Sequence, residues 1–324
     1  MSLRQKFPTV WRAILGVVSC AVLSTVLSTV LLSCTEGPSQ ENPSGRLNVV
    51  CTTDMVGDMT SRVAGPDADV VTLMPTGVDP HLYKASEGDI RRLGKADVIF
   101  YNGLALEGKI AIVLEKVSTR IPVVAVGDAV PEESRRKPPE FDGSYDPHFW
   151  HDVRLWKLVL GPIAETLAKH DPAHAEGYRS RAAALGKELD ELDAQVEKQI
   201  ASLDATKRVL VTAHDAFGYF GTRYGVDVVA IQGINTATQA ALRDIDRVVK
   251  AIVGRAVPAI FVEKSVPRRN IEAVQEACRE QGHNVVVGGS LYSDSLGTPG
   301  STEGTYKGMI EHNIHTFVEA MQRP

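Results

Sequence analysis

The chain has 324 residues, of which 44% are hydrophobic and 23% are charged. This ordinary globular composition excludes a fibrous or disordered protein, and the length favours two domains. Because 35 basic residues face 40 acidic ones, giving a formal charge of −5, there is no basic excess to bind a phosphate backbone. We therefore expect no nucleic acid as a partner.

The first 33 residues have the pattern of a secretory signal. Three basic residues, the last of them Arg12, precede an uncharged run over 13–33. The run ends in Leu31-Leu32-Ser33-Cys34, which resembles a bacterial lipobox and implies cleavage before Cys34 and lipid attachment to that cysteine. We predict a signal peptide over 1–33 and a lipid-anchored tether over 34–46, which places the protein in the periplasm or on the outer face of the cytoplasmic membrane. An uncleaved transmembrane anchor is the alternative.

Cleavage would remove three cations and no anions, so the exported body is more acidic than the whole chain. Two cysteines, Cys51 and Cys278, would then remain besides Cys34. We expect two buried thiols, with one disulfide as the alternative.

The first half of the body alternates short apolar runs with amphipathic stretches, which predicts a parallel sheet covered on both faces. The expected strands are Leu47 to Thr52, Asp69 to Met74, Asp97 to Tyr101 and Pro122 to Val126. A last helix should begin at an N-cap near Asp152 and run to about Lys169. These elements make up an N-terminal lobe over 47–171.

A long helix is predicted next, over 172–204. Leu185, Leu189, Leu192, Val196, Ile200 and Leu203 recur at spacings of three and four among charged residues. One apolar stripe therefore follows a charged helix that is long enough to link two lobes.

The alternation of strand and helix then restarts, which predicts a similar C-terminal lobe over 205–324. Its expected strands are Arg208 to Thr212, Val226 to Ile231, Ala259 to Val262 and Asn284 to Val287. Its expected helices are Ala216 to Tyr224, Ala240 to Gly254, Asn270 to Glu280 and Glu303 to Met321. The fold class is α/β, with two lobes that each hold a mainly parallel four-stranded sheet. Ligands of such sheets bind beyond the carboxyl ends of the strands, in the cleft between the lobes.

Four side chains that can bind metal follow predicted strands. His81 and His148 each close an Asp-Pro-His tripeptide, His214 follows Val211-Thr212-Ala213, and Asp294 lies beyond the last strand. Three imidazoles and one carboxylate form a complete ligand set for one divalent transition metal. The repeated tripeptide strengthens this hypothesis, since proline stiffens the approach to each histidine.

These motifs resemble a known family. Asp79-Pro80-His81, Asp146-Pro147-His148, the stretch from Val211 to Phe220 and Tyr292-Ser293-Asp294-Ser295 are similar to the TroA-type zinc- and manganese-binding solute-binding proteins of bacterial ABC transporters, solute-binding protein family 9. The resemblance covers essentially the whole exported body. It implies two lobes joined by one rigid helix, with the metal held between them by His81, His148, His214 and Asp294.

The resemblance leaves the metal open among zinc, manganese and iron. Some relatives have Glu in place of His214, and those are mostly manganese importers. Zinc-specialised relatives often carry a His-rich loop before the second Asp-Pro-His, whereas residues 131–145 contain no histidine here. Three nitrogen ligands suit zinc, while a bidentate Asp294 would suit manganese.

Two further residues are candidates for supporting the ligands. Glu263 follows a strand of the C-terminal lobe, and His151 lies three residues after His148, where it is also an auxiliary ligand candidate. His312 and His315 share a helix face, but without other ligands nearby we expect that face to be solvated.

The leading hypothesis is therefore a monomeric metal-binding protein that is not an enzyme and that serves a separate permease and ATPase. The chain has neither a bundle of membrane-spanning segments nor a phosphate-binding loop of its own. The alternative is an exported zinc hydrolase that uses the three histidines. Against it, Asp294 fills the position that a catalytic site leaves open, and the sequence has no H-E-x-x-H stretch.

Overall fold

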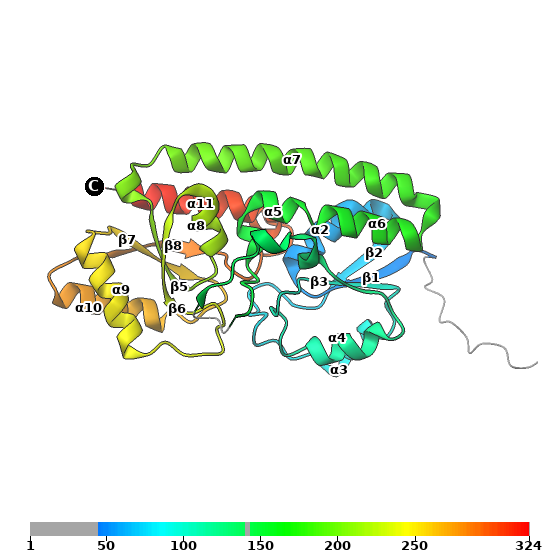
Figure 1. The fold of residues 1–324 in the computed structure, drawn as a ribbon, viewed down its shortest axis with the longest axis horizontal. Helices are drawn as coiled ribbons and strands as arrows, with labels where there is room; N and C mark the ends of the chain where they lie inside the picture. Colours follow the sequence, from blue (N-terminus) through cyan, green and yellow to red (C-terminus); the bar gives the residue numbers. More distant parts are fainter. Residues whose placement is uncertain (1–44, 140–142, 324) are drawn as a thin grey trace, which may run out of the picture. The chain divides into compact units, whose positions relative to one another are not determined.

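The computed structural model describes residues 45–139 and 143–323, so the predicted signal peptide, Cys34 and nearly all of the tether lie outside the described residues. The N-terminal lobe, from β1 to α6, holds a four-stranded parallel sheet in the order β2-β1-β3-β4, of which Figure 1 labels β1, β2 and β3. All four predicted strands are confirmed; each is shorter than predicted, and β2 begins one residue earlier. They are β1 Leu47–Cys51, β2 Ala68–Thr72, β3 Val98–Tyr101 and β4 Val123–Ala125.

This sheet is covered on both faces, as its apolar strands predicted. Successive residues of a strand point to opposite faces. Val49 and Cys51 pack in a core with α2 (Asp54–Ala64) and α6 (Leu160–His170), whereas Val50 packs in a second core with α3 (Glu87–Leu93) and α4 (Ala111–Ser118). Because helices cover both faces, a ligand would bind beyond the carboxyl ends of the strands, in the loops that follow them.

The predicted last helix of the N-terminal lobe is divided in two. Asp152 is the N-cap, as expected, and its side chain accepts hydrogen bonds from the backbone N–H groups of Arg154 and Leu155. The helix breaks between α5 (Val153–Lys157) and α6. Pro162, near the start of α6, explains the break, because its ring lacks an N–H and clashes with the carbonyl one turn earlier.

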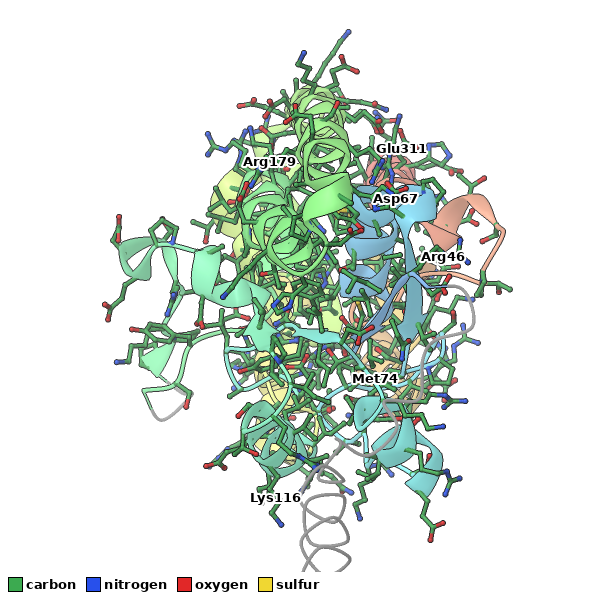
Figure 2. The ribbon with its side chains drawn as sticks, turned by 90° about the vertical axis from the view of Figure 1, so that its right-hand side faces the viewer. Arg46, Asp67, Met74, Lys116, Arg179 and Glu311 are labelled. Carbon is green, nitrogen blue, oxygen red and sulfur yellow. The ribbon has the colours of Figure 1, made fainter. Side chains whose placement is uncertain are left out.

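The long helix α7 spans Ala175–Ala201, preceded by a 3₁₀ turn over Pro172–His174 that starts where the helix was predicted to begin. All six residues of the predicted apolar stripe are buried. In Figure 1, α7 runs above both groups of strands, and it packs on α2, α5 and α6 at one end and on α8 and α11 at the other. Its outer surface is charged: Arg179, labelled in Figure 2, forms two hydrogen bonds with Glu165 of α6.

The C-terminal lobe, from β5 to α11, differs from the prediction in its sheet. Its strands β5 (Val209–His214), β6 (Asp227–Gln232), β7 (Ala259–Glu263) and β8 (Val286–Leu291) form two parallel pairs, β5-β6 and β7-β8, instead of one four-stranded sheet. Strands β5 and β7 nevertheless lie side by side. At their carboxyl ends, the Glu263 side chain accepts the backbone N–H groups of Ala213 and His214, so a carboxylate occupies donors that a neighbouring strand would otherwise use.

Strand β8 begins two residues later than predicted. It also continues through Gly288 and Gly289, which lie beyond the predicted end at Val287. Close packing explains both glycines. A Cβ at Gly288 would lie 2.7 Å from the Cβ of Ala320, and one at Gly289 would lie 2.4 Å from Cγ2 of Thr316. Both neighbours belong to α11, so the strand needs glycine to approach this helix.

The predicted helices of the C-terminal lobe are confirmed with shifts of one to three residues at their starts. They are α8 Gly218–Tyr224, α9 Leu242–Gly254, α10 Arg269–Glu280 and α11 Tyr306–Gln322. One apolar core includes the stripe of α7 and continues from the N-terminal lobe into the C-terminal lobe. The linking helix is thus packed along its length rather than standing free.

Cys51 and Cys278 are both free and buried, so the expectation of two thiols is confirmed and the alternative of a disulfide is wrong. Within residues 45–139 and 143–323, no helix is long and apolar enough to cross a membrane.

Candidate metal centre

The two Asp-Pro-His tripeptides fold in the same way. The Asp79 carboxylate accepts the backbone N–H of His81 at 2.8 Å, and the Asp146 carboxylate accepts that of His148 at 3.0 Å. An aspartate that binds the N–H two residues later forms an Asx turn, and the intervening proline fixes its φ angle. The repeated tripeptide therefore presents each histidine from a stiff turn, one after β2 and one before the 3₁₀ turn over Phe149–His151.

The C-terminal lobe supplies the other two residues from strand ends. His214 is the last residue of β5, and Asp294 lies three residues after the end of β8. Ser265, which follows β7, donates its hydroxyl hydrogen to Oδ2 of Asp294 at 3.2 Å. Two lobes thus contribute two side chains each.

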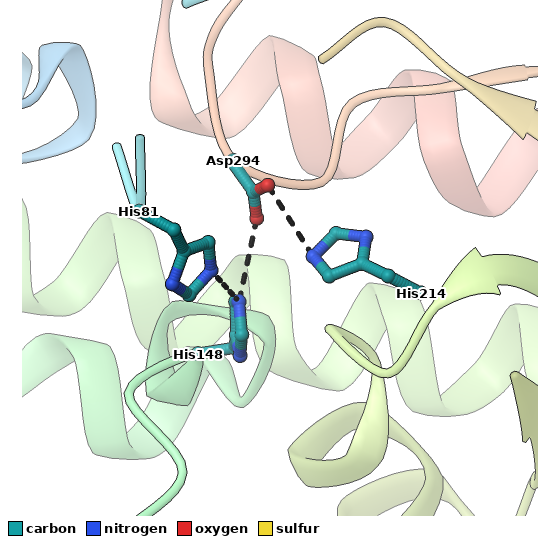
Figure 3. Close-up of side chains that lie close together, drawn as sticks. All are labelled: His81, His148, His214 and Asp294. Carbon is teal, nitrogen blue, oxygen red and sulfur yellow. Dashed lines mark hydrogen bonds and ion pairs between the residues drawn. The ribbon is translucent and has the colours of Figure 1, made fainter. Parts of the chain in front are cut away.

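The structure brings all four predicted residues together, as Figure 3 shows. Nε2 of His148 lies 3.2 Å from Nε2 of His81 and 3.4 Å from Oδ1 of Asp294. Nε2 of His214 lies 3.3 Å from Oδ2 of Asp294. One donor atom from each residue lies within 4.8 Å of the others, and no side chain of the four is more than 4% exposed.

Hydrogen bonds at Nδ1 orient two of the histidine rings, His148 and His214, so that Nε2 of each points into this cluster. Nδ1 of His148 is bonded to Asp146 at 2.8 Å, and Nδ1 of His214 is bonded to Glu263 at 2.5 Å. A proton on each Nδ1 leaves Nε2 free to act as an acceptor or a metal ligand. Nε2 of His214 and Oδ1 of Asp294 are buried without a hydrogen-bond partner. Once the Nε2 atoms are deprotonated, they and the Asp294 carboxylate are acceptors without donors, and this cluster is able to hold one divalent metal ion.

The charges in the cluster are coupled. Burial lowers the pKa values of His148 and His214, but nearby carboxylates, Asp294 among them, outweigh burial and raise both, that of His214 well above its usual range. The imidazoles in turn hold the pKa of Asp294 well below its usual range, against the effect of burial. Burial and the neighbouring His148 lower the pKa of His81 to about 3. These shifts favour protonated His148 and His214 beside an ionised Asp294 and a neutral His81 when no metal is bound.

Metal binding should consequently release protons at pH 7. The raised pKa of His214 favours its protonated form, and a divalent ion binds Nε2 only after that proton leaves. We expect apparent affinity to fall as pH decreases from 8 to 6, because protons then compete more strongly for His148 and His214. Calorimetry in two buffers of different ionisation enthalpy measures the protons released; a value of zero at pH 7, or affinity independent of pH, would contradict this charge assignment.

The two supporting candidates contact the cluster in different ways. Glu263 binds the ring and the backbone N–H of His214, so it holds this histidine directly. His151 points its Nε2 at the carbonyl oxygen of Ser293 at 3.0 Å and stacks on Phe217, so its ring is engaged outside the group of four. That carbonyl also accepts a hydrogen bond from Nε1 of Trp150, and both contacts fix the backbone one residue before Asp294.

The other described histidines lie elsewhere. His312 contacts the carbonyl of Ser290, and His315 is exposed beside Glu319. In the described part of the chain, no second group of three or more potential ligands is close enough together to hold a metal ion. The expectation of a solvated face on α11 fits His315, whereas His312 is partly buried against Ser290.

Sequence reasoning missed several residues that organise the cluster. Ser265 contacts Asp294, Arg136 forms an ion pair with Asp146 at 2.5 Å, and the Thr236 hydroxyl donates to Asp79 at 2.6 Å. Thr236 and Asp79 belong to different lobes, so this hydrogen bond links the lobes beside His81, whose backbone N–H binds the same aspartate. No sequence pattern marks these residues, because their partners are 10 to 157 positions away in the chain.

A family model described as the periplasmic component A of a zinc-uptake complex matches residues 49–320. The chain is 43% identical over 287 residues to the zinc-binding protein TroA of Treponema pallidum, covering 89% of this chain and 92% of TroA. It is 40% identical over 292 residues to the manganese-binding lipoprotein MntA of Bacillus subtilis, covering 90% of this chain and 95% of MntA.

Solved structures show the same likeness. The structure of TroA superposes with a TM-score of 0.84 at 44% identity, covering 86% of this chain and all of that one. The Fe(III)-bound structure of YtgA from Chlamydia trachomatis superposes with a TM-score of 0.77 at 26% identity, covering 85% of this chain and 97% of that one. Sequence and fold agree, and this chain belongs to the zinc-uptake component A family of periplasmic metal-binding proteins.

Proposed function

We propose that this protein is the extracytoplasmic solute-binding component of an ABC importer, which captures one divalent transition metal ion and delivers it to a membrane permease. One observation carries the proposal: the two lobes each supply two buried side chains, and one potential ligand atom from each of the four lies within 4.8 Å of the others. Such a site encloses an ion completely and can release it only when the lobes loosen.

The proposed ligands are Nε2 of His81, His148 and His214 and the carboxylate of Asp294. Glu263 supports His214 through Nδ1, and His151 supports the Asp294 loop through Ser293. The proposed lobes span 47–171 and 205–324, joined by the segment 172–204, and the packed stripe of α7 supports this division.

The proposed cargo is zinc or manganese, with iron as a further candidate. TroA is named for zinc, MntA for manganese, and YtgA was solved with Fe(III). Three nitrogen donors favour zinc, whereas Asp294, with Oδ1 unpartnered and Oδ2 near His214, could bind through both oxygens and suit manganese. Because zinc outcompetes manganese at most sites of this kind, affinity alone does not identify the cargo.

The alternative of a zinc hydrolase has less support. A catalytic zinc keeps one position open for water, whereas Asp294 supplies a fourth ligand here and the cluster is at most 4% exposed. Members of this family are solute-binding proteins rather than enzymes. We therefore propose a non-enzymatic role.

The proposed partners are a permease and its ATPase subunit, with a lipid at Cys34 holding the monomeric protein at the outer face of the membrane. Relatives described as periplasmic proteins or lipoproteins support this location.

The test is metal analysis of the protein purified from its native envelope, combined with metal uptake in a deletion strain. We expect about one transition metal ion per chain and reduced uptake of the same metal in the deletion strain. Protein without a transition metal, together with unchanged uptake of zinc, manganese and iron, would contradict the proposal. Efficient ester, peptide or lactam hydrolysis by the metal-loaded protein would instead favour the hydrolase.

A further inference from the structure

Arg136 belongs to the N-terminal lobe by sequence but lies against α8 of the C-terminal lobe. Its backbone N–H donates to the Tyr219 hydroxyl at 2.9 Å, and that hydroxyl donates to the carbonyl oxygen of Asp146 at 3.0 Å. The Arg136 guanidinium lies 5.6 Å from the centroid of the Tyr219 ring, within the range of a cation–π contact. Tyr219 therefore engages both ends of the segment that leads into His148.

Gly218 makes room for this contact. A Cβ on Gly218 would lie 1.3 Å from Nη1 of Arg136 and 2.1 Å from Cζ, so the guanidinium occupies the space of the missing side chain. Any larger residue at position 218 has to displace the arginine from α8.

The same guanidinium holds the carboxylate that holds His148. Nη1 of Arg136 lies 2.5 Å from Oδ2 of Asp146, while Oδ1 of Asp146 binds Nδ1 of His148 at 2.8 Å. The Asp146 side chain is fully buried, whereas that of Arg136 is 27% exposed. Removing one partner of a buried ion pair leaves an uncompensated charge, which the surrounding structure has to accommodate by moving.

The two Nδ1-bound histidines differ in this respect. Glu263, the carboxylate behind His214, accepts hydrogen bonds from Ala213 and His214, which belong to its own lobe. Asp146, the carboxylate behind His148, depends on an arginine that is seated on the opposite lobe. The position of His148 thus depends on contact between the two lobes, whereas the position of His214 depends on a carboxylate of its own lobe.

We propose that Arg136 is a positioning residue that, seated on Gly218 and Tyr219, holds Asp146 and His148 in place for the metal and slows its release until α8 moves away. This proposal rests on the proposed function, because it takes His148 to be a ligand. It goes beyond the four proposed ligands, because a residue that does not touch the metal couples contact between the lobes to metal retention. Arg136 lies within residues 131–145, the stretch that contains no histidine in this chain.

The test is the rate of Zn²⁺ and Mn²⁺ dissociation into excess chelator, measured by stopped flow on Arg136→Ala, Gly218→Ala and the double variant. Each single variant should release metal about 10- to 100-fold faster, the range typical of residues that support a metal ligand. The double variant should be no faster than the faster single variant, since both changes break the same contact. Lys137→Ala, which removes a neighbouring cation, and Gly161→Ala, where a Cβ meets nothing within 4 Å, should release metal at the wild-type rate.

Two further readouts separate positioning from loss of folding. Arg136→Lys keeps the charge but not the planar fork, so it should release metal at an intermediate rate. The visible absorption of Co²⁺-loaded Arg136→Ala should shift toward that of His148→Ala while its far-ultraviolet circular dichroism stays unchanged.

Wild-type release rates in Arg136→Ala and Gly218→Ala would overturn the proposal, and so would independent, multiplying effects in the double variant. A wild-type protein that binds none of these ions would instead refute the proposed function, so the two failures are distinguishable.

Discussion

Replacing Asp294 with alanine should lower the affinity for Zn²⁺ by about 10²- to 10³-fold. Zinc sites with four ligands bind with roughly 10–16 kcal/mol, so one ligand accounts for about 2.5–4 kcal/mol, and about 1.4 kcal/mol corresponds to a factor of ten. The loss should reach the upper part of this range, because Asp294 is the one anion among the four and lies near both His148 and His214. Competition with a chromophoric chelator measures the change.

Two variants control for this result. Asp294→Asn keeps the shape and one oxygen but removes the charge, so it should lose most of the same affinity. Asp246→Ala removes an exposed carboxylate from α9 of the same lobe and should bind Zn²⁺ like the wild type. Wild-type affinity in Asp294→Ala would exclude this carboxylate as a ligand.

Replacing Glu263 should affect both the fold and the metal. Glu263→Ala leaves two backbone N–H groups and Nδ1 of His214 without their acceptor, at about 1–3 kcal/mol for each buried unsatisfied group. We expect a loss of about 3–5 kcal/mol in the free energy of unfolding, measured by urea denaturation of the metal-free protein. The loss should be large because Glu263 joins β7 to the end of β5, where the two strand pairs do not share a ladder.

Glu263→Gln separates the two effects. Its side-chain oxygen can still accept the N–H groups of Ala213 and His214, but its amide would donate toward Nδ1 of His214. That contact favours the tautomer with the proton on Nε2, the atom proposed to bind metal. We expect stability closer to the wild type than that of Glu263→Ala, but a Zn²⁺ affinity about 10- to 100-fold lower. Equal metal affinity in Glu263→Gln and the wild type would show that this tautomer does not matter.

Local patterns predicted much of the fold and the candidate site. The Asp-Pro-His tripeptides predicted two stiff turns because an Asx turn needs residues only two positions apart, and both turns occur. The stripe from Leu185 to Leu203 predicted a buried helix face for the same reason, since its period is a property of the helix alone.

The misses arose where distant packing decides the structure. Gly288 and Gly289 lower the strand propensity of β8, yet α11 requires them. The C-terminal strands form two pairs, and the Glu263 side chain bridges the ends of β7 and β5, 49 and 50 residues apart in the chain, which no local pattern reveals. Pro162 is different, because the break between α5 and α6 could have been predicted from the sequence.

Anomalous diffraction from crystals of the metal-loaded protein tests the central claim most directly, because it locates the ion by element. For the zinc-loaded protein, the account predicts one peak. It should lie about 2.0–2.2 Å from Nε2 of His81, His148 and His214 and from a carboxylate oxygen of Asp294. A peak at any other place, or one bound by three or fewer of these four residues with a water completing the set, would contradict it.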